Sequence, residues 1–295
     1  MSSEKENLKK YYEFELRDGY PVFSVQNILL LEALIKYNSD YSVTADENHP
    51  EFGESYAGIL TKERESFFDF VSRDSLRILE TEAEKINKNP DTDEEGREKD
   101  SLYKVVQSID KINSTHLMSE GSSVKVHKGI LKTVERIKSI DNLKERMKAG
   151  DPSLVHEIAS AVETKYNFSF ASKFCVYVSE IALEKSDAFC IYDNVVQSVL
   201  PLYIHRYVGK DEAEKYYKIV NKGKKNARVE STVSNLKCEK GYKEYRDIIN
   251  RIIKGVEDKD DIKITYSQFD HMLWYYFKGS KLKVQEALNT LLKDS

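Results

Sequence analysis

The chain has 295 residues, enough for two domains of ordinary size, which excludes small disulfide-stapled and fibrous scaffolds. Glycine and proline number only 12 and 5, so the composition favours an all-α protein and argues against an all-β sandwich or barrel. The net charge of -4 combines two segments of opposite sign, because residues 45–100 contain 17 acidic and 8 basic residues whereas residues 208–254 contain 13 basic and 7 acidic ones.

Helical spacing of apolar residues predicts most of the elements in the first half of the chain. The dense apolar run within Tyr11–Tyr37 and the apolar spacing within Thr61–Ile86 both predict helices. The polar stretch Asn89–Asp100 has almost nothing to bury, which predicts a solvated loop at a domain boundary. Two further helices are expected at Leu102–Ile112 and Ile130–Met147.

A helical hairpin is predicted next. Gly150 suits a helix C-cap, and the Asp-Pro step at residues 151–152 suits the start of a helix over Leu154–Lys165. A second helix is expected at Phe170–Glu184. The turn between them contains Asn167, which tolerates a left-handed conformation, and Ser169, which can cap the second helix or donate to a phosphate.

The remaining elements follow a loop over residues 185–192. Asp193 stands in the N-cap position of a helix with the sequence VVQSVLPLYIHRYV, in which Pro201 should produce a kink or a break. Helices at Tyr242–Gly255, Ser267–Lys278 and Val284–Leu292 complete the chain. Together these elements predict an all-α fold with three regions, which are residues 1–100, residues 101–208 and residues 209–295.

A basic run, NKGKKNAR, lies between the predicted helices of the last region. Lys222, Lys224, Lys225 and Arg228 could follow a phosphate backbone while the acidic segment faces away from it. The alternative interpretation is a solvated loop between helices.

Lys173 and Asp193 form the constellation that points to chemistry. Lys173 lies between Phe170 and Tyr177 at helical spacing, so its stem should run beside aromatic groups. Loss of hydration disfavours the charged ammonium and leaves more of the amine that can act as a nucleophile. If the loop folds back, this amine and the carboxylate at the start of the next helix face one pocket.

This segment resembles the helix-hairpin-helix (HhH-GPD) DNA glycosylase superfamily, which includes endonuclease III and the 8-oxoguanine glycosylases. Lys173 in ASKFC matches the lysine nucleophile of bifunctional members, and Asp193 in CIYDNVVQSVL matches the catalytic aspartate, with a similar separation. The resemblance covers roughly Leu154–Tyr207. The turn lacks the glycines of the family's LPGxG pattern.

The resemblance implies a two-lobed helical fold and DNA glycosylase activity. It also implies AP-lyase activity if Lys173 forms a Schiff base with the sugar. It implies action on damaged or modified DNA, in repair or in antiviral defence against modified phage DNA. The turn residues Tyr166, Asn167 and Ser169 would bind DNA together with the basic run. Tyr177, Tyr192 and Trp274 are candidates for stacking on an extruded base, although a core role explains them as well.

The competing hypothesis is a non-catalytic helical module that binds DNA or a protein. Three cysteines without a CxxC pair support no disulfide framework, zinc cluster or iron-sulfur cluster, and the histidines lack metal-ligand spacing. We therefore expect no cofactor and no metal. No apolar run has the length of a bilayer span, so we expect a cytoplasmic monomer that does not enter a membrane.

Overall fold

The computed structural model describes residues 13–43, 56–62, 64, 67–68, 101–113, 115, 117, 128–163 and 165–293. The chain divides into two compact units. Unit 1 comprises Met1–Ser39, Asp193–Leu236 and Glu244–Ser295, and unit 2 comprises Asp40–Tyr192 and Lys237–Lys243. Each unit collects segments that are distant in sequence, so these divisions differ from the consecutive regions expected from the sequence.

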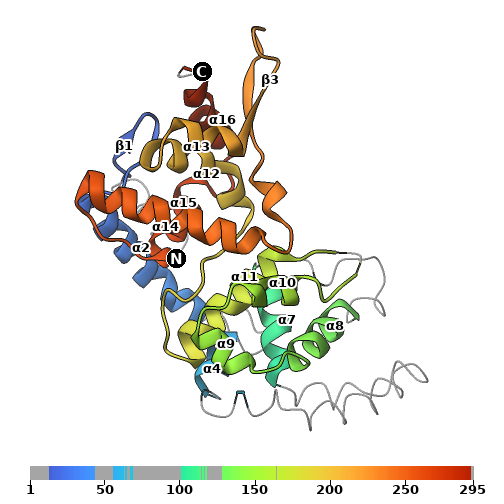
Figure 1. Cartoon of the computed structure of the whole chain (residues 1–295). Helices are drawn as coiled ribbons and strands as arrows, with labels where there is room; N and C mark the ends of the chain where they lie inside the picture. The colour runs from blue at the N-terminus through green and yellow to red at the C-terminus, as the bar shows by residue number, and fades with distance from the viewer. Residues whose placement is uncertain are drawn as a thin grey trace. The chain divides into compact units, whose positions relative to one another are not determined.

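Unit 2 is helical in its described part (Figure 1). Its elements are α4 (Tyr56–Lys62), α7 (Ser101–Asn113), α8 (Lys128–Lys138), α9 (Leu143–Lys148), α10 (Ser153–Ala159), α11 (Phe168–Tyr177) and the π-helix η3 (Val178–Ala182). The helix predicted at Leu102–Ile112 is confirmed as α7, whose residues Leu102, Val105 and Ile109 are fully buried at helical spacing. Residues 69–86 and the loop predicted at 89–100 lie outside the described residues.

Three predicted helix boundaries in unit 2 were wrong. The helix expected at residues 130–147 is two helices, α8 and α9, because Asn142 between them adopts a left-handed conformation with φ of 54°. Helix α10 ends at Ala159 rather than near residue 165. The helix expected at residues 170–184 starts earlier, at Phe168, and changes to the π-helix η3 after Tyr177.

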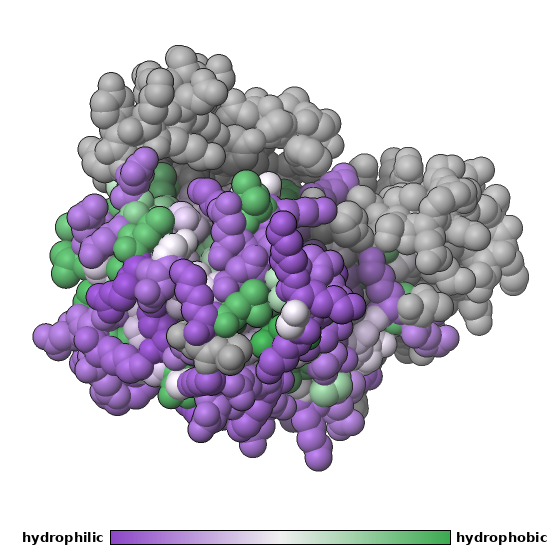
Figure 2. All heavy atoms as spheres, turned by 90° about the horizontal axis from the view of Figure 1, so that it is seen from above, coloured by the Kyte–Doolittle hydropathy of each residue, from purple (hydrophilic) through white to green (hydrophobic). Residues whose placement is uncertain are grey.

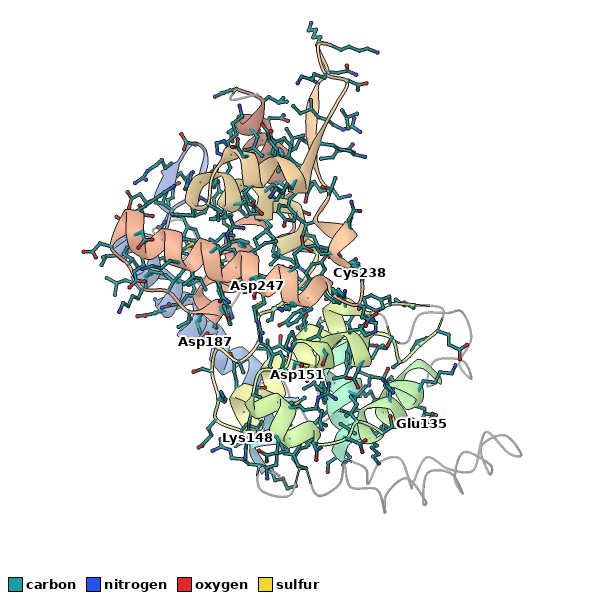
Figure 3. The ribbon with its side chains drawn as sticks, in the orientation of Figure 1. Glu135, Lys148, Asp151, Asp187, Cys238 and Asp247 are labelled. Atoms are coloured by element: carbon teal, nitrogen blue, oxygen red, sulfur yellow. The ribbon has the colours of Figure 1, made fainter. Side chains whose placement is uncertain are left out.

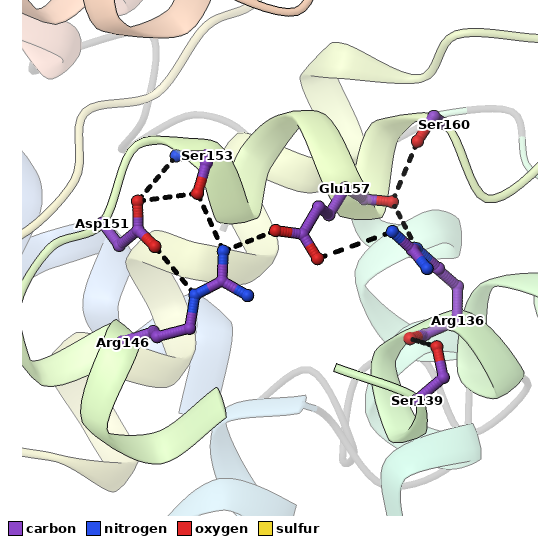
Figure 4. A network of polar contacts seen from close by, with 7 residues as sticks. All are labelled: Arg136, Ser139, Arg146, Asp151, Ser153, Glu157 and Ser160. Atoms are coloured by element: carbon purple, nitrogen blue, oxygen red, sulfur yellow. Dashed lines mark hydrogen bonds and ion pairs between the residues drawn. The ribbon is translucent and has the colours of Figure 1, made fainter. Parts of the chain in front are cut away.

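A network of charged side chains joins α8, α9 and α10 (Figure 4). The Arg146 guanidinium donates to Asp151 Oδ2 at 2.7 Å, to Ser153 Oγ at 2.8 Å and to Glu157 Oε1 at 2.5 Å. Arg136 Nε donates to the backbone oxygen of Glu157 at 3.2 Å. Burial alone would raise the pKa of Asp151, but hydrogen bonds from Arg146 and Ser153 outweigh it and lower that pKa. The network therefore fixes the first helix of the hairpin.

Unit 1 contains helices and two short antiparallel strand pairs in its described part (Figure 1). Its elements are β1 (Leu16–Arg17), β2 (Tyr20–Pro21), most of α2 (Val25–Val43), α12 (Asn194–Tyr207), α13 (Lys210–Ala213), the 3-10 turn η4 (Glu214–Tyr216), β3 (Tyr217–Val220), β4 (Arg228–Ser231), the 3-10 turn η5 (Val233–Leu236), most of α14 (Gly241–Asp260), α15 (Tyr266–Phe277), α16 (Lys281–Asn289) and the 3-10 turn η6 (Thr290–Leu292). The mainly helical fold is thus confirmed.

An aromatic cluster forms the core of unit 1. Phe23 stacks on Phe269 with ring centroids 5.9 Å apart, and Tyr203 meets Phe269 edge-on at 5.7 Å. The Tyr20 hydroxyl donates to the backbone oxygen of Leu202 at 3.2 Å. These contacts attach the N-terminal strand pair and Phe23, which precedes α2, to α12 and α15.

The break that was one alternative at Pro201 is absent, since α12 runs through this residue, and the kink that was the other alternative stays a prediction. On the face of the molecule shown in Figure 2, hydrophilic residues predominate and hydrophobic ones form small groups between them. Among the described residues, no helix has both the length and the apolar character of a membrane span.

Candidate functional site

The helical hairpin of unit 2 turns at Asn167. Its Oδ1 accepts from Phe170 N at 3.1 Å, which caps α11, and its Nδ2 donates to the backbone oxygen of Thr115 at 2.8 Å. Asn167 has φ of -94°, so it does not use the left-handed conformation that an asparagine tolerates, and it is the helix cap, a role that Ser169 could also have taken. Because Asn167 is 6% exposed and holds two elements together, we assign it a structural role at this turn.

The other two turn residues are half-buried. The Tyr166 ring stacks on Phe168. The Tyr166 hydroxyl oxygen lies 2.8 Å from His156 Nδ1 and donates to the backbone oxygen of Cys238 at 3.2 Å (Cys238 is labelled in Figure 3). Burial, together with negative charge at Cys238 and Glu239, raises the pKa of Tyr166 to about 12. The phenol therefore stays a neutral hydrogen-bonding group at neutral pH.

Lys173 lies in the middle of α11. It is 8% exposed, and both Phe170 and Phe174 beside it are fully buried, as expected for a lysine with an aromatic environment on its helix. Burying a lysine is costly, and among the described residues Lys138 in α8, at 5% exposed, is buried as well.

Asp193 is the N-cap of α12, as the sequence predicts. Its Oδ1 accepts from Val195 N at 2.8 Å and from Val196 N at 3.0 Å, and the residue is 6% exposed. The other carboxylate oxygen, Oδ2, has no hydrogen-bond partner among the described residues. The cap thus fixes one oxygen and leaves the second available.

The hydroxyl of Ser172 in α11 contacts the end of the loop that leads to Asp193. Ser172 Oγ accepts from Tyr192 N at 3.0 Å and lies 3.4 Å from Tyr192 O, both within unit 2. Ser172 directly precedes Lys173, and Tyr192 directly precedes Asp193. We call this contact the Ser172–Tyr192 tether. It was not predicted, because a small hydroxyl in a helix carries no sequence signal for a contact 20 residues away.

The three aromatic residues predicted to contact a base are in different settings. The Tyr192 ring is fully buried and meets Phe168 edge-on at 4.6 Å, so it serves the core of unit 2. Tyr177 is half-buried and donates to Asn113 Oδ1 at 3.0 Å, also in unit 2. Trp274 belongs to unit 1 and is 38% exposed. A common base pocket therefore stays a prediction, as does the pairing of Lys173 in unit 2 with Asp193 in unit 1.

The basic run forms the tip of the hairpin of β3 and β4, where the sequence indicated only a loop (Figure 1). Lys222, Lys224 and Lys225 are exposed and have no ion-pair partner among the described residues. Arg228 differs, since it pairs with Glu230 at 2.6 Å. Two hydrogen bonds anchor the base of the hairpin in unit 1: Ser231 Oγ donates to the backbone oxygen of Gln197 in α12, and Gln285 Nε2 in α16 donates to that of Val229 at 3.3 Å. The hairpin is thus attached close to the start of the Asp193 helix.

Glu180 in η3 is a further titratable group that sequence reasoning missed. Burial, and to a lesser degree the charge of Asp187 (labelled in Figure 3), raises the pKa of Glu180 to about 7. Its sequence position on an amphipathic helix gave no hint of this environment. Among the residues that the structure describes, no group of three or more His, Cys, Asp or Glu side chains could hold a metal ion.

Comparison with known proteins gives two partial matches. A family model described as an N-terminal domain, HI_0787_N, matches residues 64–182, a region that contains α10, α11 and Lys173 but ends before Asp193. A Haemophilus influenzae protein named "Uncharacterized protein" is 37% identical over 75 residues, which are 24% of this chain and 34% of that protein. The match thus spans about a third of that relative's length. No solved structure matches the chain.

Proposed function

We propose that this protein is a DNA glycosylase that removes a damaged or modified base. The observation that carries the proposal is the Ser172–Tyr192 tether, since it joins the residue before a buried lysine to the residue before a buried aspartate. Two charged residues that are each less than a tenth exposed have a high desolvation cost, which is typical of groups retained for chemistry. The helical hairpin before them agrees with the resemblance to the helix-hairpin-helix glycosylases.

Asp193 would stabilise the positive charge that develops on the deoxyribose as the glycosidic bond breaks. Its Oδ1 is fixed by two backbone amides, so the orientation of the carboxylate is set before substrate binds. Its Oδ2 has no partner among the described residues and is available to face the sugar. A carboxylate that is shielded from water interacts with a developing charge more strongly than one in bulk solvent.

Lys173 would attack the sugar in the same step. The lone pair of Nζ forms a bond to C1′, and the base leaves with the electron pair of the glycosidic bond and takes up a proton. The C1′–O4′ bond then breaks as the sugar ring opens, O4′ leaves with the electron pair and takes up a proton, and the nitrogen, which loses both amine protons, is left in an imine between Nζ and C1′. The target nucleotide must first leave the duplex, at a cost of a few kcal/mol.

The β3–β4 hairpin would bind the DNA backbone. Lys222, Lys224 and Lys225 have no ion-pair partner among the described residues and would bind phosphates whatever the base sequence. The anchoring of the hairpin to α12 keeps this charge on the unit that carries Asp193. The hairpin therefore suits an enzyme that searches DNA before it reacts at one nucleotide.

The test uses oligonucleotides that carry a panel of damaged and naturally modified bases, in single-stranded and duplex form. Incubation with the full chain should produce alkali-sensitive abasic sites with at least one of them. The matched control is Asp193→Asn, which keeps the cap but lacks the negative charge. Tight DNA binding without abasic sites on any substrate would overturn the proposal and favour a non-catalytic DNA-binding module, to which the basic hairpin also points.

A further inference from the structure

The chain contains one tryptophan, Trp274, which lies on the surface of unit 1 near the end of α15. It is 38% exposed, and its indole N–H has no hydrogen-bond acceptor among the described residues. A tryptophan that serves the core usually has its ring covered and its N–H bonded. Packing within unit 1 therefore leaves part of this side chain unused.

A neighbouring ring supports the indole. Tyr275 lies perpendicular to Trp274 with ring centroids 5.3 Å apart, and the Tyr275 hydroxyl donates to the backbone oxygen of Leu34 in α2 at 3.2 Å. Because Tyr275 is itself fixed, it holds the exposed ring in position.

Three lysines lie close to Trp274 in the sequence. Lys278 Nζ is 5.8 Å from the centroid of the Trp274 ring, and Lys283 Nζ is 4.3 Å from the centroid of the Tyr276 ring. Lys278, Lys281 and Lys283 are exposed and have no ion-pair partner among the described residues. We call Trp274 and these three lysines the Trp274 surface.

The short connection between α15 and α16 fixes the backbone of this surface. Lys278 N donates to the backbone oxygen of Trp274 at 3.0 Å and ends α15, and Gly279 turns the chain with φ of 78°. Ser280 Oγ accepts from Lys283 N at 3.3 Å and caps α16. The lysines are thus placed around the indole before any partner binds.

We propose that the Trp274 surface binds a segment of single-stranded nucleic acid. A base stacks on the indole, and the lysines neutralise phosphates of the same strand. A duplex fits less well, because its bases already stack on one another and offer no free face. The proposal goes beyond the proposed function, since an extruded base occupies an enclosed pocket, whereas Trp274 lies on the surface.

Two other partners fit the surface less well. Lysine is depleted at protein–protein interfaces, whereas residues 274–286 contain three lysines and one carboxylate, Glu286. A helix that lies on a membrane needs a broad apolar face, but the exposed Leu282 stands between Lys281 and Lys283 in α16. Positive charge beside an exposed ring therefore favours a polyanion that carries flat rings.

The experiment uses the fluorescence of Trp274, which reports on this surface alone because the chain has no other tryptophan. The unmodified protein is titrated with oligodeoxythymidylate or oligouridylate of about 12 nucleotides, within the usual range of single-strand binding sites. Tryptophan emission should be quenched as the strand binds, with the midpoint given by the anisotropy of a labelled strand. The two strands distinguish DNA from RNA, and a duplex of equal length should leave the emission unchanged.

Variants of Trp274 test the stack itself. Trp274→Ala should raise the Kd for the labelled strand about 5- to 150-fold, the effect of losing one base–aromatic stack. Trp274→Leu keeps an apolar side chain without a π-face and should lose as much, whereas Trp274→Phe should retain most of the affinity. Thermal unfolding of each variant checks that unit 1 stays folded.

The lysines are tested by the salt dependence of strand binding. Replacing Lys278, Lys281 and Lys283 by glutamine should make the log-log slope less steep by about 2.1, at about 0.7 per contact with a single strand. Lys254→Gln is the matched control, because Lys254 is an exposed lysine of unit 1 that already lies 2.9 Å from Asp258. Its slope should change by less than about 0.7.

Strand binding that leaves tryptophan emission unchanged, or equal affinity of the wild type and Trp274→Leu, would overturn the inference. A response to phosphatidylserine vesicles and to neither strand would overturn it as well and assign the surface to a membrane. The strands carry only unmodified bases, so quenching does not depend on base release. Loss of either result therefore leaves the other proposal standing.

Discussion

The hairpin of β3 and β4 offers a quantitative test of the DNA-binding surface. Lys222, Lys224 and Lys225 are exposed and unpaired among the described residues, so each can release one counterion when it neutralises a phosphate. The logarithm of the binding constant falls with the logarithm of the salt concentration, with a slope of about -0.9 for each phosphate contact. Replacing all three lysines by glutamine should therefore make this slope for duplex DNA less steep by about 2.7. When salt rises from about 50 to about 200 mM, the affinity of the wild type should fall by a factor that is about 40 times larger than the factor for the variant.

The assay is fluorescence anisotropy of a labelled duplex at a series of salt concentrations. Lys218→Gln is the control on the same hairpin, because Lys218 is already paired with Glu230 at 3.3 Å and has less charge to offer to a phosphate. Its slope should change by less than about 0.9. Equal slopes for the wild type and the triple variant would show that DNA follows another path over the protein.

Three further predictions concern the fold and the site. Asp193→Asn should retain the helix cap, so its unfolding transition should match that of the wild type, while the rate of base release falls about 10²–10³-fold. An unchanged rate of base release would show that Asp193 takes no part in the reaction. Gly255→Ala should destabilise the protein by about 1–3 kcal/mol in denaturant unfolding, because its Cβ would overlap the backbone oxygen of Tyr207 in α12; an unaltered midpoint would contradict the close packing of these helices. Folding raises the pKa of Glu180 from 4.5 to about 7, so the folded state binds the carboxyl proton more tightly than the unfolded state does. The free energy of unfolding should therefore fall as the pH rises from 4.5 to about 7, by up to about 3 kcal/mol. Glu180→Gln should remove that fall, and an identical pH profile for both proteins would refute the assignment.

Much of the helical structure could be predicted from residue spacing. Helix α7 matches its prediction closely because Leu102, Val105 and Ile109 recur at every third or fourth position and are fully buried. The break between α8 and α9 was missed because the apolar pattern continues through Asn142, whose backbone conformation has no periodic signature. The β3–β4 hairpin was missed because its strands are four residues long and its turn is dominated by lysine.

The candidate site was predictable only in part. The capping role of Asp193 follows from a local rule about the residue before a helix, and the burial of Lys173 follows from its aromatic neighbours. The Ser172–Tyr192 tether joins residues that are 20 positions apart, so it depends on how distant segments pack, which a single sequence does not encode in any spacing.

The assembly of unit 1 from three segments has a consequence for biosynthesis. Residues 40–192 supply nearly all of unit 2 and leave the ribosome before residues 193–295 of unit 1, so unit 2 can fold while the chain is still being made. The strand pair β1–β2, although synthesised earlier, must wait for α12, where Arg206 stacks on Tyr20 and donates to the backbone oxygen of Pro21. Expression of residues 193–295 alone would leave this face of α12 uncovered, so a truncated unit 1 should need the segment 13–39 supplied in trans to become soluble.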